Sequence, residues 1–227
     1  MGLFGGSFSP FHYGHQQISI DFIIQNQLDY LLIIPNFVSP FKIDNSENNR
    51  NIDRIAIINS YFDSLDANLQ AKILVLDYDI KKNEISYTYD TIEYIKYNIQ
   101  NILNVKINNN AQFQYYFLIG DDNLLNFDKW KNWEEILNLV DLVVAFRLEN
   151  KNNIETIIKQ KYSKYQSKIQ LLENPIYDIS ATKIRFYLEE LLKLNNNEIY
   201  PKLSKFINQF TIESYLKNKN PFSNKSI

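Results

Sequence analysis

The chain has 227 residues and a mass of 27.0 kDa, which is the size of one ordinary domain with or without a small appendage. Its 24 basic and 26 acidic residues nearly cancel to a net charge of −2, which argues against a nucleic-acid coat or a polybasic membrane binder. The absence of cysteine excludes disulfides, thiolate catalysis and cysteine-ligated zinc, and two histidines cannot form a three-histidine metal site within one chain.

The first predicted element is a short strand at residues 3–4 that stops at Gly5 and Gly6, and a helix follows over residues 14–27. A continuous apolar run over residues 30–35 predicts a strand buried on both faces. The later elements are expected in this order: a polar loop over 35–51, a helix over 52–62, a strand over 71–76, a helix over 88–103, a strand over 113–119, a helix over 133–139, a strand over 139–146, a helix over 154–162, an apolar run over 169–172, a helix over 182–194 and a helical tail over 201–217.

This alternation predicts an α/β fold, a doubly wound parallel sheet of the Rossmann-like kind with short C-terminal helices. We expect a single domain over residues 1–220 and a short polar tail over 221–227. No signal peptide or membrane span is visible, so we expect a cytoplasmic protein. Ligands of such sheets bind beyond the carboxyl ends of the strands, so the loops that follow strands are the places to search for chemistry.

The densest signal is the string over residues 5–15, GGSFSPFHYGH. Four of the five glycines lie within the first 14 residues, and both histidines, His12 and His15, belong to this string. Glycines directly after a strand let the backbone turn sharply and approach a ligand. A helix N-terminus suits phosphate, and two imidazoles beside it can donate hydrogen bonds to oxygens that gain charge during phosphoryl or nucleotidyl transfer. Neither the dinucleotide fingerprint nor the lysine-bearing P-loop is met; the bland alternative is a glycine-rich turn with two surface histidines.

A second segment, ISATKIR over residues 179–185, carries side chains suited to phosphate. Ser180 can cap the following helix, Thr182 offers a hydroxyl, and Arg185 can direct its guanidinium at phosphate oxygens. The alternative is an ordinary capped amphipathic helix with a surface arginine.

Residues 5–15 resemble the G-G-S/T-F-D-P-x-H-x-G-H segment of the nucleotidyltransferase superfamily, and residues 179–185 resemble its I-S-S/A-T-x-I-R motif. Three middle segments narrow the resemblance to the bacterial nicotinate-nucleotide adenylyltransferases. They are IPNFVSPFK over 34–42, similar to I-P-N-x-x-P-P-H-K; SYTYDT over 86–91, similar to S-Y-T-x-D-T, where Thr88 is a natural N-cap; and IGDD over 119–122 followed by Trp130, similar to I-G-x-D…W. Without the family, Trp130 reads as a packing residue.

The resemblance implies that the chain joins nicotinate mononucleotide to ATP, giving deamido-NAD and pyrophosphate, with Mg²⁺ carried by the ATP phosphates and with few protein ligands. It implies catalytic roles for His12, His15 and Arg185. It implies ATP contacts at Gly5, Gly6, Ser7, Phe8, Gly14, Gly120, Asp122, Ser180 and Thr182, and substrate contacts at Asn36, Lys42, Tyr87, Thr88 and Trp130.

Departures from the family pattern leave alternatives open. Ser9 replaces the usual aspartate, Phe41 replaces a histidine, Ser39 replaces a proline, and Asp53 stands where a histidine often precedes Arg54. One alternative is a related adenylyltransferase that takes nicotinamide mononucleotide or phosphopantetheine; another is a non-catalytic nucleotide-binding module. We expect no nucleic-acid or membrane partner, and the sequence leaves a homo-oligomer open.

Overall fold

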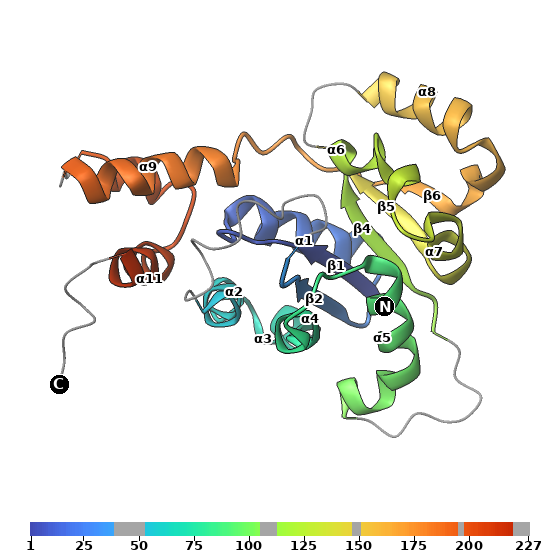
Figure 1. The fold of residues 1–227 in the computed structure, drawn as a ribbon, viewed down its shortest axis with the longest axis horizontal. Coiled ribbons are helices and arrows are strands. Elements are labelled where there is room, and N and C mark those ends of the chain that lie inside the picture. The colour runs from blue at the N-terminus through green and yellow to red at the C-terminus, as the bar shows by residue number, and fades with distance from the viewer. Residues whose placement is uncertain (39–52, 105–112, 147–150, 195–197, 220–227) are drawn as a thin grey trace.

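A computed structural model describes residues 1–38, 53–104, 113–146, 151–194 and 198–219. Its centre is a six-stranded parallel sheet of order β3-β2-β1-β4-β5-β6 (Figure 1). The strands are β1 (Gly2–Gly6), β2 (Leu31–Pro35), β3 (Ile73–Val75), β4 (Tyr116–Gly120), β5 (Asp141–Ala145) and β6 (Ile169–Leu171). This is the predicted doubly wound Rossmann-like architecture.

Helices cover both faces of the sheet. They are α1 (Tyr13–Gln25), α2 (Arg54–Phe62), α3 (Ala67–Gln70), α4 (Tyr78–Lys82), α5 (Thr88–Leu103), α6 (Asp121–Leu124), α7 (Trp133–Leu139), α8 (Lys151–Lys161), α9 (Ala181–Leu194), α10 (Tyr200–Leu203) and α11 (Gln209–Lys219), with short 3-10 turns η3 (Phe127–Lys129) and η4 (Ser163–Lys168). Among the described residues, no helix has the length and apolar character needed to cross a bilayer.

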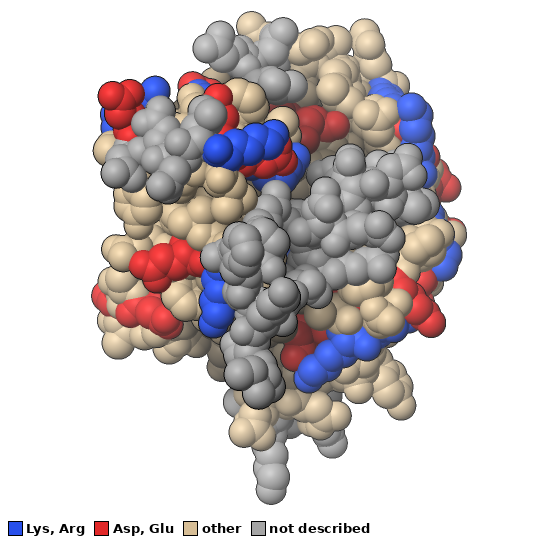
Figure 2. All heavy atoms as spheres, turned by 60° about the vertical axis from the view of Figure 1, so that its left-hand side comes forward, with Lys and Arg blue, Asp and Glu red and all other residues tan. Residues whose placement is uncertain are grey.

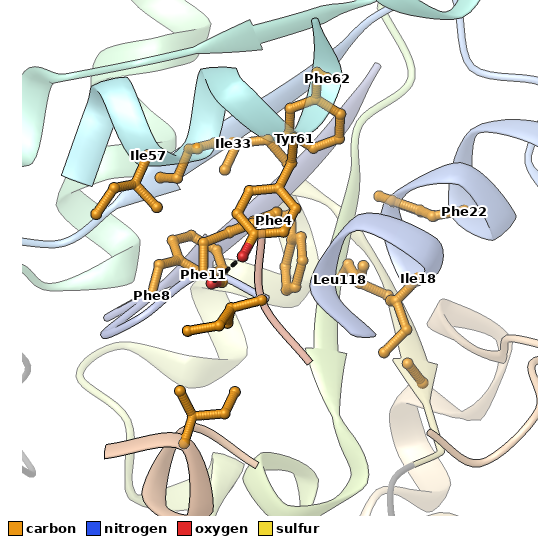
Figure 3. Packing of buried hydrophobic residues seen from close by; sticks show 14 of the residues in the cluster. Phe4, Phe8, Phe11, Ile18, Phe22, Ile33, Ile57, Tyr61, Phe62 and Leu118 are labelled. Carbon is orange, nitrogen blue, oxygen red and sulfur yellow. Dashed lines mark hydrogen bonds between the residues drawn. The ribbon is translucent and has the colours of Figure 1, made fainter. Parts of the chain in front are cut away.

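Alternate residues of the buried strands enter two separate cores, because successive strand side chains point to opposite faces. Leu31 and Ile33 join the core that α1, α2 and the C-terminal helices cover, whereas Leu32 and Ile34 join the core under α5, α7 and α8. Every residue of β2 is buried, as the continuous apolar run predicts. Figure 3 shows the first core, in which Ile18 of α1 lies beside Leu118 of β4, and Ile57 of α2 lies beside Ile33 of β2.

Two expectations about element boundaries are corrected. Strand β1 does not stop before Gly5 but continues through Gly6, because it pairs with β2 as far as Pro35. The expected helical tail over 201–217 is two helices. Asn208 separates them: its side chain accepts from the Thr211 backbone N–H at 2.9 Å and so begins α11 as a cap. Helix α11 packs against α2 and α9.

Candidate active site

The site lies at the topological switch point of the sheet. Strands β1 and β4 are parallel neighbours at its centre, with Gly2 paired to Tyr116 and Phe4 to Leu118. Chain connections leave these two strands in opposite directions, which opens a crevice at their carboxyl ends. The segment from Ser7 to His12 follows β1 at this edge, and Gly120 ends β4 at the same edge. The topology therefore brings together two of the predicted segments, residues 5–15 and residues 119–122.

The turn after β1 is made by Phe8 rather than by the glycines. Neither Gly5 nor Gly6 has a positive φ, whereas Phe8 has a φ of 44°, and the Ser9–Pro10 peptide bond is cis. The expected sharp glycine turn is thus wrong. Gly6 is required for space instead, since a Cβ there would lie 2.9 Å from the Phe8 ring. At Gly5 the nearest atom to a Cβ would be 3.6 Å away, an ordinary contact.

His12 and His15 form a reciprocal capping box at the start of α1. The Nδ1 of His12 accepts from the His15 backbone N–H at 3.3 Å, and the Nδ1 of His15 accepts from the His12 backbone N–H at 3.3 Å. The rings stack with centroids 3.6 Å apart and 23° between their planes. Because Nδ1 of each ring is an acceptor, a neutral imidazole carries its proton on Nε2. The capping geometry thus selects the tautomer that donates from Nε2, as the proposed contact with phosphate oxygens requires.

Aromatic side chains hold His15 in place. The rings of Phe8 and Phe11 lie 5.2 Å and 5.1 Å from the imidazole, and both phenylalanines are buried. Tyr61 of α2 packs edge-on against Phe11 and donates from its hydroxyl to the Phe11 carbonyl at 3.1 Å (Figure 3). His12 is almost fully buried, and His15 is half-buried. Gly14 is buried beside them, where a Cβ would lie 3.1 Å from the Nδ1 of His12.

Helix α9, which is distant in sequence, contacts the same loop through Arg185. Arg185 donates from Nη1 to the Ser9 carbonyl at 2.7 Å and from Nη2 to the Thr182 hydroxyl at 3.1 Å. Ser180 accepts from the Lys183 backbone N–H at 3.2 Å, which confirms its predicted capping role. The structure therefore brings Arg185 and Thr182 to the loop that carries His12, as the two-motif interpretation requires.

The predicted acceptor residues lie on the next loops of the same edge. Asn36 follows β2; its N–H donates to the Gly6 carbonyl at 3.0 Å, and its buried Oδ1 accepts no hydrogen bond within the described part of the chain. Tyr87 and Thr88 stand at the start of α5, where the prediction of Thr88 as N-cap is wrong. Tyr87 occupies the cap position and Thr88 is the first helical residue, with no side-chain cap bond. Lys42 lies outside the described residues.

The lysine that follows Trp130 connects its segment to Tyr87 and the start of α5. Trp130 is half-buried against Phe127 and Phe117, with ring centroids 5.3 Å and 6.3 Å away. The next residue, Lys131, donates to both carboxylate oxygens of Asp90 at 3.0 Å and lies 4.7 Å above the Tyr87 ring. The segment after η3 is therefore joined to the start of α5.

The residues after β4 occupy the first turn of α6. Gly120 is the N-cap position, and Asp122 is exposed. Asp121 is fully buried and accepts from the Asp122 backbone N–H at 2.8 Å. Asp122, the predicted nucleotide contact, is thus the carboxylate that a ligand can reach. No group of three or more His, Asp or Glu side chains that could hold a metal ion occurs among the described residues.

Arg54 lies at the candidate site, although the sequence motifs assigned no role to it. Its Nη1 donates to the carbonyls of Ser7 at 3.0 Å and Asn36 at 2.6 Å, so it joins the loop after β1 to the loop after β2. Burial lowers the pKa of its guanidinium. One signal was present in the composition: the chain has only four arginines among its 24 basic residues, so an arginine in the first turn of a helix is informative.

Comparisons with known proteins agree with this geometry. The sequence pattern of the cytidylyltransferase-like family matches residues 3–186. Probable nicotinate-nucleotide adenylyltransferases are similar along most of the chain: that of Clostridium novyi is 32% identical, covering 81% of this chain and 84% of the relative, and that of Fusobacterium nucleatum is 33% identical, covering 82% and 85%. A Plasmodium falciparum nicotinic acid mononucleotide adenylyltransferase complexed with NaAD has the same fold, with a TM-score of 0.69, 19% identity and coverage of 95% and 94%.

Proposed function

We propose that this chain, which belongs to the cytidylyltransferase-like nucleotidyltransferases and within them to the nicotinate-nucleotide adenylyltransferase family, transfers the adenylyl group of ATP to nicotinate mononucleotide. The observation that carries the proposal is the convergence of His12, His15 and Arg185 on one loop at the switch point of the sheet. This is where an α/β sheet binds nucleotides, and the three side chains suit a polyphosphate.

In the proposed reaction, a 5′-phosphate oxygen of nicotinate mononucleotide attacks the α-phosphorus of ATP in line. The bond between the α-phosphorus and the oxygen that bridges to the β-phosphorus breaks, and pyrophosphate leaves with the electron pair. No covalent protein intermediate is needed, so the protein contributes by positioning the two substrates and neutralising charge.

We assign the donor side to the loop after β1, α6 and α9. The Nε2–H groups of His12 and His15 donate to triphosphate oxygens, and the positive end of α1 lies beside them. Arg185 and Thr182 hold the pyrophosphate as it leaves. Gly5, Gly6, Ser7 and Phe8 offer backbone contacts to ATP, with Gly14, Gly120, Asp122 and Ser180 completing the donor side.

We assign the acceptor side to Asn36, Tyr87, Thr88 and Trp130, with Lys42 as a further assignment from sequence alone. Among the described residues, the buried Oδ1 of Asn36 has no hydrogen-bond partner, and this supports the acceptor side of the proposal, because a ligand N–H or O–H there would recover the free energy of an unmet acceptor. Mg²⁺ enters as its complex with ATP. The described residues offer no carboxylate cage, so phosphate and water oxygens are its proposed ligands.

The test is a pyrophosphate-release assay with purified protein, ATP and Mg²⁺. Nicotinate mononucleotide, nicotinamide mononucleotide and phosphopantetheine are offered as acceptors at equal concentrations, and the adenylylated products are identified by mass spectrometry. We expect the highest kcat/KM with nicotinate mononucleotide. Better turnover of another acceptor overturns the substrate assignment, and calorimetric ATP binding without turnover of any acceptor overturns the enzymatic one.

A further inference from the structure

We propose that the carboxyl group of Asp79 is a positioning residue for the acceptor nucleotide, acting through Ser86 and Thr91 on the loop after β2 and on the start of α5. The inference rests on the proposed function, because these are the segments that carry the acceptor residues Asn36, Tyr87 and Thr88. Asp79 lies outside the motifs quoted above, which include residues 34–42 and 86–91 on either side of it.

Asp79 lies on the short helix α4 and is 5% exposed. Within the described part of the chain, it and Asp121 are the two buried carboxylates. Helix α4 is packed firmly onto α5 next to it, since the Tyr78 and Tyr94 rings stack with centroids 3.6 Å apart and 10° between planes. Burying a carboxylate costs free energy unless hydrogen-bond donors compensate. The groups that surround the Asp79 carboxyl therefore indicate which segments it connects.

The first donor is Thr91, one turn into α5. Its hydroxyl lies 2.8 Å from the Oδ1 of Asp79 and 3.2 Å from the Tyr87 carbonyl oxygen. Thr91 is itself buried. The carboxyl group of Asp79 is thereby tied to the first turn of α5, which presents Tyr87 and Thr88.

The second neighbour is Ser86, which connects that turn to the loop after β2. The Ser86 hydroxyl oxygen accepts from the Phe37 N–H at 3.1 Å, and the Ser86 N–H donates to the Val38 carbonyl at 3.0 Å. The Ser86 side chain is also near enough to the Asp79 carboxyl to lower its pKa. The hydroxyl that accepts from the backbone directly after Asn36 is therefore a neighbour of Asp79.

The groups around Asp79 partly offset the cost of burying its negative charge. Burial raises the pKa of Asp79, while the Thr91 and Ser86 side chains and the charge of Lys82 on α4 lower it, and Asp90 on α5 raises it. An apolar residue would fill the same space without the desolvation cost. The carboxylate is thus explained by the two segments that it connects.

The test uses Asp79→Asn in the full chain. Asparagine has the same shape, but its amide N–H₂ cannot accept a hydroxyl proton, so one of the two links is lost. We expect the KM for nicotinate mononucleotide to rise about tenfold, the equivalent of one hydrogen bond to a charged group, while kcat and the KM for ATP stay within about twofold. Ser86→Ala should give the same split, and the double variant should cost less than the sum of the two because both act through one contact.

Lys82→Ala is the matched control. It removes a charge near Asp79, and its ammonium pairs with Glu84 at 3.3 Å. We expect both KM values to be unchanged. Equal rises in the KM for ATP and for the acceptor in Asp79→Asn, a fall in kcat alone, or a loss of thermal stability with both KM values unchanged would each overturn the positioning role. If Asp79→Asn does not fold, Ser86→Ala decides by the same split.

The outcome is separable from that of the proposed function. If the wild type prefers another acceptor, the substrate assignment is wrong, and the KM split measured with that acceptor still decides the role of Asp79. If the wild type turns over no acceptor, both proposals are overturned.

Discussion

The imidazoles of His12 and His15 are stacked 3.6 Å apart, and each accepts a hydrogen bond from the backbone of the other. The two contacts cap the first turn of α1 and select the Nε2–H tautomer in both rings. One local arrangement therefore begins the helix and leaves two Nε2–H donors, which we propose to contact a polyphosphate.

Replacement of His15 tests the donor role directly. We expect His15→Ala to lower kcat about 100-fold, because one charge-stabilising contact in the transition state is removed. Gln17→Ala on the same helix is the control and should keep its rate, because the Gln17 side chain donates a hydrogen bond to Asp21 at 3.2 Å. Steady-state kinetics measure both, and a His15→Ala variant with full kcat removes this residue from the mechanism.

The Arg185 guanidinium should matter through its shape as well as its charge. Arg185→Lys keeps the charge but cannot reach both the Ser9 carbonyl and the Thr182 hydroxyl. We expect about a tenfold loss in kcat/KM for ATP, the value of one charged hydrogen bond. Lys183→Ala, which deletes a neighbouring positive charge on α9, should lose little. Full kcat/KM in Arg185→Lys together with a clear loss in Lys183→Ala would mean that only overall charge counts.

A methyl group at Gly14 should impair catalysis without unfolding the protein. The new Cβ would meet the Nδ1 of His12 at 3.1 Å and displace that ring. We expect Gly14→Ala to lower kcat and to change the melting temperature only slightly. Gly2→Ala is the contrast: its Cβ would lie 2.4 Å from Leu28 in the core, so the melting temperature should fall there. A normal kcat in Gly14→Ala would show that the His12 position is not critical.

Arg54 should couple the two substrates, because it bonds the carbonyls of Ser7 and Asn36. Arg54→Met keeps much of the side-chain length and removes the donors, so we expect the KM values for ATP and for the acceptor to rise together. This joint rise differs from the split that we expect for Asp79→Asn. An increase in only one of the two KM values contradicts the bridging role.

The pH dependence of stability should report on Asp79. Burial raises the pKa of its carboxyl above the ordinary 3.8, so the folded protein binds this proton more tightly than the unfolded chain. The resulting stabilisation is fully present below 3.8 and is lost as the pH rises through the folded-state pKa. We expect the wild type to gain unfolding free energy relative to Asp79→Asn as the pH falls through this window. Urea unfolding of both proteins measures it, and a constant difference contradicts the shift.

The charge balance also bears on partners. On the face shown in Figure 2, basic and acidic side chains of the described residues are interspersed. On this face, Lys and Arg side chains do not form a broad basic patch of the kind that attracts nucleic acid or an anionic membrane surface.

Local patterns predicted a large part of the fold. The apolar stripe over residues 88–103 predicts α5 with the bounds that the structure has, and residues 133–139 likewise match α7. Ser180 caps α9 as expected. These features depend on residues within a few positions of each other, which is the range over which periodicity and capping act. Two of the wrong predictions, the glycine turn and the Thr88 cap, concern the backbone conformation of single residues, which neighbouring packing decides. The other two, the end of β1 and the single C-terminal helix, concern element boundaries.

By itself, the sequence determined the succession of strands and helices along the chain and the two strings around His12 and Arg185 that we propose to bind phosphate, because each is encoded in a short run of residues. The tertiary structure alone decided that Arg185 meets the Ser9 carbonyl across 176 positions, that Arg54 joins two loops, and that Asp79 accepts a hydrogen bond from Thr91. Such contacts depend on which strands become neighbours in the sheet. The order of the strands within the sheet is set by the burial of the whole chain rather than by any one segment.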